Sequence, residues 1–326
     1  MLPDQAITAL VCWARKKLHF GTSSKTSERV ALLSRHASLP NFVVKPVNVA
    51  SVKHLSVFRY PGGKTWFVPW LKLWLRSLEE KPQVLIEPFG GGGISALTAV
   101  YENLVSSALI AEKDPSVSAV WKACLSDDAP RLAKKIRGFD FDPETVMDKI
   151  EKGLRKTDPV ELAFAVILLN RIRRGGVMAP GAGVLKNGEN GNGLVSRWYP
   201  ETLAMRVETI FSLRERIKFI EGDGTALIAK YKGKKNAAMF ADPPYTHAGK
   251  RLYLHWVLNH EKFLKKIRNF CGPFIATYDD TEEVRGWAQA CKLEWAKVPM
   301  KSTGHQMKEE LVIGRDLSWL KPRVNV

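Results

Sequence analysis

Short apolar runs alternate with stretches of helical periodicity in two separate parts of the chain. In the first part, strands are predicted at Val84–Ile86 and Ala108–Ala111, with a helix at Ile94–Tyr101 between them. An amphipathic helix is also predicted before them, at Trp66–Leu78, although Pro69 lies within it. From residue 219 onward the alternation of strands and helices resumes. Strands are predicted at Phe219–Gly224, Ala237–Ala241 and Pro273–Tyr278, and helices at Ala226–Tyr231 and His260–Phe270. A hairpin of Leu293–Val298 with Glu310–Gly314 is predicted at the end. Strands that alternate with helices are typical of a doubly wound α/β sheet.

The regions outside these two parts differ in character. Residues 116–218 are mostly helical in pattern and basic, and they contain a glycine- and asparagine-rich loop that is too long for a simple connector. Residues 1–50 are weakly patterned, with one helix predicted at Gln5–Leu18. We therefore predict an N-terminal extension at 1–50, an α/β domain formed by 51–115 together with 219–326, and a helical insertion at 116–218.

The charge of the chain narrows the choice of partner. Fifty Lys and Arg residues against 33 Asp and Glu give a net charge of +17, and the sequence pI is about 9.7. Such an excess favours a polyanion, and nucleic acid before a membrane, because the sequence shows no long basic amphipathic helix and no lipidation signal. A generically basic soluble protein is the alternative.

Cysteine usage and hydropathy indicate the compartment. Cys12, Cys124, Cys271 and Cys291 lie far apart without Cys-x-x-Cys spacing, which predicts reduced thiols and neither a disulfide framework nor a structural zinc site. The apolar stretches are too short to span a bilayer, and Asp4 ahead of a brief apolar run is the wrong order for a signal peptide. We expect a cytoplasmic protein with no membrane partner.

The most informative motif is Asp242-Pro243-Pro244-Tyr245, which directly follows the predicted strand Ala237–Ala241. Two prolines cannot continue a strand ladder, so they form a stiff corner that holds a carboxylate and an aromatic ring at the edge of a sheet. Such a corner suits a planar amine, because the carboxylate and the carbonyl between the prolines can both accept from its amino group. A proline turn with a surface aspartate is the alternative interpretation.

A run of four glycines, Gly90–Gly93, lies between the predicted strand and helix of the first part. Glycine permits positive φ and close approach to a ligand, which is typical of the nucleotide-facing bend of a Rossmann-like sheet. The acid that would accept from ribose hydroxyls is Glu112, 19 residues after Gly93 (112 − 93), with Asp114 as its competitor. The phosphate-loop spacing is absent, which disfavours an NTPase, and the dinucleotide fingerprint is incomplete.

Three motifs in one order carry a family resemblance: Tyr60-Pro61-Gly62-Gly63-Lys64, then Glu87-Pro88-Phe89 with Gly90–Gly93, then Asp242–Tyr245. With them the chain resembles the Dam-type (alpha-class) DNA adenine N6-methyltransferases over residues 56–316. The resemblance implies a Rossmann-like class I methyltransferase sheet, mostly parallel with one antiparallel strand, and assigns target recognition to the helical insertion. Smaller matches lie at Glu112-Lys113-Asp114, Glu221-Gly222-Asp223 and Glu309–Ile313.

The resemblance implies transfer of a methyl group from S-adenosyl-L-methionine to the exocyclic N6 of adenine in a specific double-stranded DNA sequence, with base flipping and without a metal. Asp242 and the Pro243 carbonyl would accept from the adenine amino group, and Tyr245 would stack on the base. The expected catalytic residues are Asp242, Pro243, Pro244 and Tyr245. The expected cofactor-binding residues are Tyr60, Lys64, Pro88, Phe89, Gly90, Gly91, Gly92, Gly93, Glu112, Asp223 and Asp242.

For three of these residues a different role is also consistent with the sequence. Glu112 would hold the ribose hydroxyls of the cofactor unless Asp114 does so. Asp223 would contact the cofactor's adenine, yet it could equally cap a helix that begins after it. Lys64 would lie at the methionine end of the cofactor and near Asp242, or it is a plain surface lysine.

The expected DNA contacts are basic residues of the insertion and of the loop after the proline corner. Arginine suits this role because its rigid guanidinium fork matches both phosphate and guanine. Trp198 and Tyr199 either stack on DNA or belong to the core. The predicted DNA-binding residues are Arg171, Arg173, Arg174, Arg197, Lys250 and Arg251.

Other functions stay open at this point. An enzyme that methylates RNA adenine or cytosine N4 would use a similar corner, and a catalytically silent DNA-binding relative would keep the fold. The sequence leaves the recognition sequence undecided, as it does a restriction–modification or a solitary role. The oligomeric state is equally open, and a monomer or weak dimer is expected.

Overall fold

The computed structural model describes residues 49–60, 62–179, 182–185, 193–246, 253–255, 257–301 and 307–320. The chain divides into two compact units, Met1–Phe42 and Val43–Val326, and every described residue belongs to the second. The predicted helix at Gln5–Leu18 therefore lies outside the described residues.

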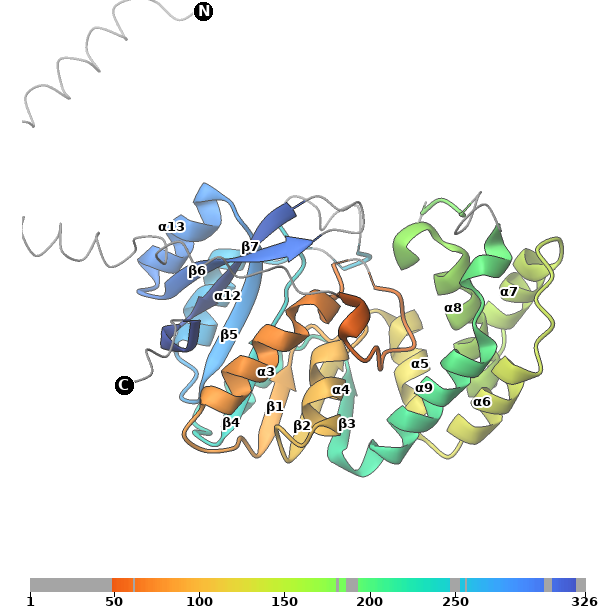
Figure 1. The fold of residues 1–326 in the computed structure, drawn as a ribbon, viewed down its shortest axis with the longest axis horizontal. Coiled ribbons are helices and arrows are strands. Elements are labelled where there is room, and N and C mark those ends of the chain that lie inside the picture. The colour runs from red at the N-terminus through yellow and green to blue at the C-terminus, as the bar shows by residue number, and fades with distance from the viewer. Residues whose placement is uncertain are drawn as a thin grey trace, which may run out of the picture. The chain divides into compact units, whose positions relative to one another are not determined.

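A seven-stranded sheet with the order β3-β2-β1-β4-β5-β7-β6 forms the centre of this unit (Figure 1). The strands β1 to β5 pair in parallel, whereas β7 runs antiparallel to both β5 and β6. This arrangement confirms the predicted fold class, a mostly parallel Rossmann-like sheet with one antiparallel strand. The strands are β1 (Val84–Glu87), β2 (Ser107–Glu112), β3 (Ile217–Glu221), β4 (Ala237–Ala241), β5 (Phe274–Asp279), β6 (Glu294–Lys301) and β7 (Met307–Gly314).

Alternate residues of the central strands enter two separate cores, because successive side chains of a strand point to opposite faces. On β4, Met239 belongs to the core cluster beneath one face, while the ring of Phe240 stacks on Phe67 at the other, with centroids 5.4 Å apart. All five residues of β4 are buried. Burial on both faces explains why this strand reads as a continuous apolar run.

Helices cover both faces of the sheet. α4 and α5 contact strands β1 to β3, and α3 packs on α4. Residues of α10, α12 and α13 share the core cluster on the opposite face. Their bounds are α3 (Val68–Ser77), α4 (Ile94–Tyr101), α5 (Pro115–Leu125), α10 (Thr225–Tyr231), α12 (His260–Arg268) and α13 (Glu282–Ala290).

The chain between β2 and β3 forms a helical part beside the β3 edge of the sheet, opposite β6 and β7 (Figure 1). α5 joins the two parts because it contacts β2 and β3 on one side and α8 and α9 on the other. Two 3-10 turns, η3 (Arg174–Gly176) and η4 (Leu194–Arg197), follow α8. The remaining helices are α6 (Ala129–Arg137), α7 (Val146–Leu154), α8 (Pro159–Ile172) and α9 (Pro200–Ser212).

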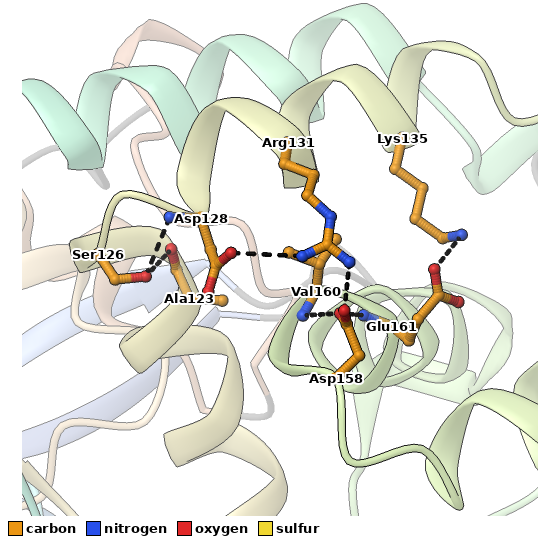
Figure 2. A network of polar contacts seen from close by, with 8 residues as sticks. All are labelled: Ala123, Ser126, Asp128, Arg131, Lys135, Asp158, Val160 and Glu161. Atoms are coloured by element: carbon orange, nitrogen blue, oxygen red, sulfur yellow. Dashed lines mark hydrogen bonds and ion pairs between the residues drawn. The ribbon is translucent and has the colours of Figure 1, made fainter.

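A polar network fastens α6 to the start of α8 (Figure 2). Asp158 caps α8 by accepting from the backbone N–H groups of Val160 and Glu161, at 2.9 and 3.0 Å, and it also pairs with Arg131 of α6. Lys135, one turn further along α6, lies 2.7 Å from the Glu161 carboxylate. The cap satisfies N–H groups that no helical turn can reach, so it contributes more than the exposed ion pairs.

Two helices differ from what the local sequence patterns predicted. The predicted helix at Trp66–Leu78 begins as a 3-10 turn, η2 (Lys64–Phe67), and α3 then carries Pro69 in its first turn, where the missing N–H costs no hydrogen bond. α13 was not predicted, although Thr281 caps it through Val284 N and two acidic residues follow in the first turn. Within the described part of the chain, no helix is long and apolar enough to cross a membrane.

Candidate active site

A cavity of about 790 Å³ opens at the carboxyl ends of the parallel strands. The strand order reverses between β1 and β4, and ligands of doubly wound sheets bind at this switch point. The carboxyl groups of Glu87, Glu112 and Asp242, which end β1, end β2 and follow β4, all line the cavity. The sheet topology therefore gathers acids that are far apart in the sequence.

Asp242 is held in place by two groups that are distant in the chain. Thr277 on β5 donates its hydroxyl to Asp242 Oδ1 at 2.8 Å, and Lys64 Nζ lies 2.9 Å from the same oxygen. Both contacts use Oδ1, and the side chain retains 18% exposure toward the cavity. The carboxylate is thus fixed through one oxygen and accessible from the cavity.

Lys64 is the centre of a buried polar network. Its side chain is 3% exposed, and its ammonium donates to Gly62 O at 3.0 Å and to the Tyr245 hydroxyl at 2.7 Å in addition to its contact with Asp242. Glu310 on β7 lies 3.5 Å from the ammonium and accepts the Tyr245 hydroxyl hydrogen. One cation therefore links two carboxylates and the tyrosine of the proline corner.

Burial and charge act in opposite directions on this network. Burial raises the pKa of Asp242 and of Glu310, and the positive charge of Lys64 partly offsets that rise. Burial lowers the pKa of Lys64, but the two carboxylates outweigh it, so that its pKa stands above the ordinary value. Lys64 therefore stays protonated, and Asp242 is a stronger base than a solvated aspartate.

The glycine run is required by close packing around it. Gly91 has a φ of +47°, and a Cβ there would lie 2.7 Å from the ring of Tyr60. Gly93 has a φ of +62° at the N-cap of α4, and its Cβ would lie 2.4 Å from Trp121. Trp121 on α5 also donates its indole N–H to Gly91 O at 3.0 Å. Sequence reasoning missed Trp121, because nothing in a helical pattern distinguishes it from a core residue.

The two candidate ribose acids have different surroundings. Asp114 caps α5 by accepting from Ser116 N at 2.8 Å and Val117 N at 3.4 Å. Glu112 accepts from Gly91 N at 2.7 Å, and burial raises its pKa. Asp114 therefore caps a helix through one oxygen, Glu112 is joined to the glycine run, and both residues line the cavity.

Asp223 lies both next to a helix start and at the cavity. It accepts from Thr225 N, the first residue of α10, at 2.9 Å, although Gly224 occupies the N-cap position, and it also lines the cavity. Glu87, which was not predicted as a site residue, similarly accepts from Ala96 N at 3.0 Å in the first turn of α4. Burial raises the pKa of Glu87 well above its usual range.

Asn170 joins the helical part to the motif that carries Lys64. It is fully buried at the end of α8, accepts from Arg59 N at 2.9 Å and donates to Arg59 O at 2.8 Å. The same amide donates to Gly176 O at 2.9 Å. A buried amide that pairs with backbone fixes the segment just before Tyr60, a role of Asn170 that was not predicted from the sequence.

The predicted DNA-binding arginines fall into different environments. Arg171 is 3% exposed and lines the cavity. Arg173 donates to backbone carbonyls after η3, the nearest being Met178 O at 2.8 Å, whereas Arg174 is exposed. Arg197 ends η4. Lys250 and Arg251 lie outside the described residues.

Trp198 and Tyr199 have separate roles. Trp198 is buried, and its ring packs against Phe139, Phe141 and Phe164 with centroids 5.5, 5.8 and 6.1 Å away. The core interpretation of Trp198 is therefore correct. Tyr199 is 42% exposed and lines the cavity.

Comparison with known proteins assigns the family. A family model described as D12 class N6 adenine-specific DNA methyltransferase matches residues 60–301. The chain belongs to this family. The D12 match begins at Tyr60 and extends past the proline corner, so it includes all three motifs.

The other comparisons add little to this assignment. No curated protein matches the chain. Among solved structures, the chain is similar to a crystal structure provisionally described as an RNA methyltransferase, PH1948 from Pyrococcus horikoshii, with 11% identity and a TM-score of 0.34 over 90% of this chain and 97% of that one.

Proposed function

We propose that this D12 family member is a Dam-type, alpha-class enzyme that methylates the N6 amino group of adenine in a specific double-stranded DNA sequence. The observation that carries the proposal is the fixed carboxylate of Asp242 at the cavity, held through Oδ1 by Lys64 and Thr277. A single oxygen of a rigid carboxylate, directed by a proline corner, suits recognition of one amino group.

The residues around the glycine run fit S-adenosyl-L-methionine. Glycines at Gly91 and Gly93 keep side chains out of the bend, the aromatic residues Tyr60 and Phe89 line the cavity, and Glu112 supplies an acceptor for ribose hydroxyls. When bound, this cofactor supplies the electrophilic methyl group. The volume of about 790 Å³ lies within the range of small-molecule sites.

Asp242 would act on the attacking nitrogen. The lone pair of the adenine amine is delocalised into the ring, and an acceptor for one N–H hydrogen favours a pyramidal, more nucleophilic nitrogen. Oδ2 of Asp242 would accept that hydrogen and the Pro243 carbonyl the other, so that positive charge developing on the nitrogen is stabilised. The raised pKa of Asp242 strengthens this acceptor.

Tyr245 would present its ring to the base from a fixed position. Its hydroxyl is bonded to both Lys64 and Glu310, which restricts rotation of the side chain. Pro244, its neighbour in the chain, lines the cavity, whereas Tyr245 itself is not among the lining residues. Stacking of a flipped adenine on this corner would offset part of the cost of unstacking it from the duplex.

The helical insertion would recognise the DNA target. Residues 116–218 contribute Arg171, Tyr199 and Arg206 to the cavity wall, and the net charge of +17 favours a polyanion. Arg174, exposed at the start of η3, is the predicted contact best placed for phosphates at the protein surface.

The test compares methyl transfer by the wild type with transfer by Asp242→Ala. Labelled S-adenosyl-L-methionine is incubated with unmethylated genomic DNA, with RNA and with DNA that contains cytosine but no adenine. We expect label at adenine N6 of DNA and a loss of at least about a hundredfold in Asp242→Ala. Cofactor affinity, measured by calorimetry, should change little.

Asp148→Ala is the matched control, because Asp148 on α7 has a side-chain exposure of 62% and, among the described residues, forms an ion pair only with Lys152. It should retain wild-type transfer. Label on RNA alone or at cytosine N4 would replace the proposal by one of the alternative substrates. Cofactor binding without transfer to any polymer would indicate a catalytically silent relative.

A further inference from the structure

One wall of the cavity carries basic side chains that take no part in the proposed chemistry at the adenine nitrogen. We call His54, Arg59, Arg171 and Arg206 the basic wall; all four line the cavity. They come from the segment before the Tyr60 motif, from the end of α8 and from α9. The fold therefore concentrates them, since Arg171 and Arg206 follow His54 and Arg59 by more than a hundred residues in the chain.

Arg171 is the most buried member of the basic wall. Its Nη2 donates to Val57 O, while its Nε is buried and has no hydrogen-bond partner among the described residues. His54 Nδ1 is likewise buried without a hydrogen-bond partner among the described residues. Buried polar groups are normally paired, so two orphaned donors or acceptors at one cavity wall call for a ligand.

Arg171 and Arg206 also lack charge compensation by a described carboxylate. Within the described part of the chain, no carboxylate forms an ion pair with Arg171 or Arg206, and Arg206 donates only to Ser56 O at 3.2 Å. Burial, together with the charges of Arg206 and Arg59, lowers the pKa of Arg171 to about 9. Burial and the neighbouring Arg206 and Arg171 lower the pKa of His54 to about 4. Arg171 and Arg206 are thus cations in an environment that penalises their charge.

We infer that the basic wall is a preformed site for one backbone phosphodiester of the target strand, next to the flipped nucleotide. The inference rests on the proposed DNA substrate and adds the anchor for its backbone. A phosphate would neutralise Arg171 and Arg206, and a guanidinium fork is well suited to its oxygens.

A backbone phosphate fits this wall better than the carboxylate of the cofactor. Arg171 and Arg206 belong to α8 and α9 of the helical part, whereas the glycine run and Glu112 belong to the sheet. Exposed Tyr199 lines the same cavity and lies just before α9, which offers an aromatic surface next to the site. An arginine pair with a neighbouring aromatic ring is typical of a nucleic-acid contact.

The first experiment probes the wall with inorganic phosphate and without DNA. Melting temperatures are compared in phosphate and in chloride at equal ionic strength for the wild type, Arg206→Met and Arg76→Met. Arg206 is half-buried, so its replacement is safer for folding than that of Arg171. Arg76 is 60% exposed on α3, pairs with Glu102 and does not line the cavity, so it controls for lost charge.

Phosphate should raise the melting temperature of the wild type and of Arg76→Met by about 2 °C more than that of Arg206→Met. Equal shifts in all three proteins would overturn the basic wall as an anion site. This outcome is independent of catalysis, and it leaves the proposed methyl transfer standing.

The second experiment measures DNA affinity against salt concentration and cofactor affinity by calorimetry. Arg206→Met should bind a duplex roughly ten- to a hundredfold more weakly at low salt, with a slope of log K against log salt smaller by about 0.9. Cofactor affinity should stay at the wild-type value. Weakened cofactor binding with unchanged DNA binding would overturn the inference and assign the wall to the cofactor. If the wild type methylates no DNA at all, it is the proposed function that fails.

Discussion

Replacing Lys64 by Met should destabilise the protein in a way that depends on pH. The side chains of Lys64, Asp242 and Glu310 are 3%, 18% and 7% exposed, and one ammonium serves both carboxylates. Removing one partner of a buried ion pair typically costs 3–5 kcal/mol, because the remaining charge is left uncompensated. We therefore expect a loss of about 3–5 kcal/mol in the free energy of unfolding at pH 8.

The sign of the pH dependence follows from the pKa shifts. Burial already raises the pKa of Asp242 and Glu310, and loss of Lys64 raises both further. The folded variant then binds more protons than the unfolded chain, so its stability falls as pH rises through these raised pKa values. The deficit relative to the wild type should thus shrink at pH 5.

Urea unfolding followed by tryptophan fluorescence at pH 5 and pH 8 measures this deficit. Lys72→Met is the control: Lys72 is 28% exposed and pairs with Glu102 at 2.7 Å, and such surface pairs contribute about 1 kcal/mol or less. Adding Glu310→Gln to Lys64→Met should recover roughly 1–2 kcal/mol at pH 8, since one uncompensated carboxylate disappears. A deficit below 1 kcal/mol, or one equal at both pH values, would refute the buried network as described.

The remaining predictions concern catalysis and cofactor binding. Because burial raises the pKa of Asp242 and Lys64 counteracts that rise, the acid limb of kcat/KM should lie above the pKa of a free aspartate, about 3.9, and Lys64→Met should move it to still higher pH. Acid limbs at the same pH in the wild type and in Lys64→Met would contradict this role of Lys64. Trp121→Phe removes the 3.0 Å hydrogen bond to Gly91 O and should weaken cofactor binding roughly three- to tenfold by calorimetry. Unchanged affinity would show that packing alone positions the glycine run.

Much of the fold could be predicted from the sequence, because the strands are short and apolar on both faces. β4 coincides with the predicted strand Ala237–Ala241, and β1 and β2 differ from prediction by one or two residues at their ends. The glycine run and the proline corner could also be predicted, since both need residues with unusual backbone properties. α13 was missed because its pattern is weakly apolar, and Thr281 was not recognised as its cap.

The sequence by itself determined the sheet, the two backbone motifs and the acids that end the strands, because each depends on neighbours in the chain. Only the tertiary structure decided which distant groups meet them: Lys64, Thr277 and Glu310 come together around the proline corner from separate elements. It also placed Arg171 inside the cavity wall, although a basic sequence pattern suggests a solvated side chain. Long-range pairing of buried charges depends on chain topology, which a local pattern of hydrophobic and polar residues does not encode.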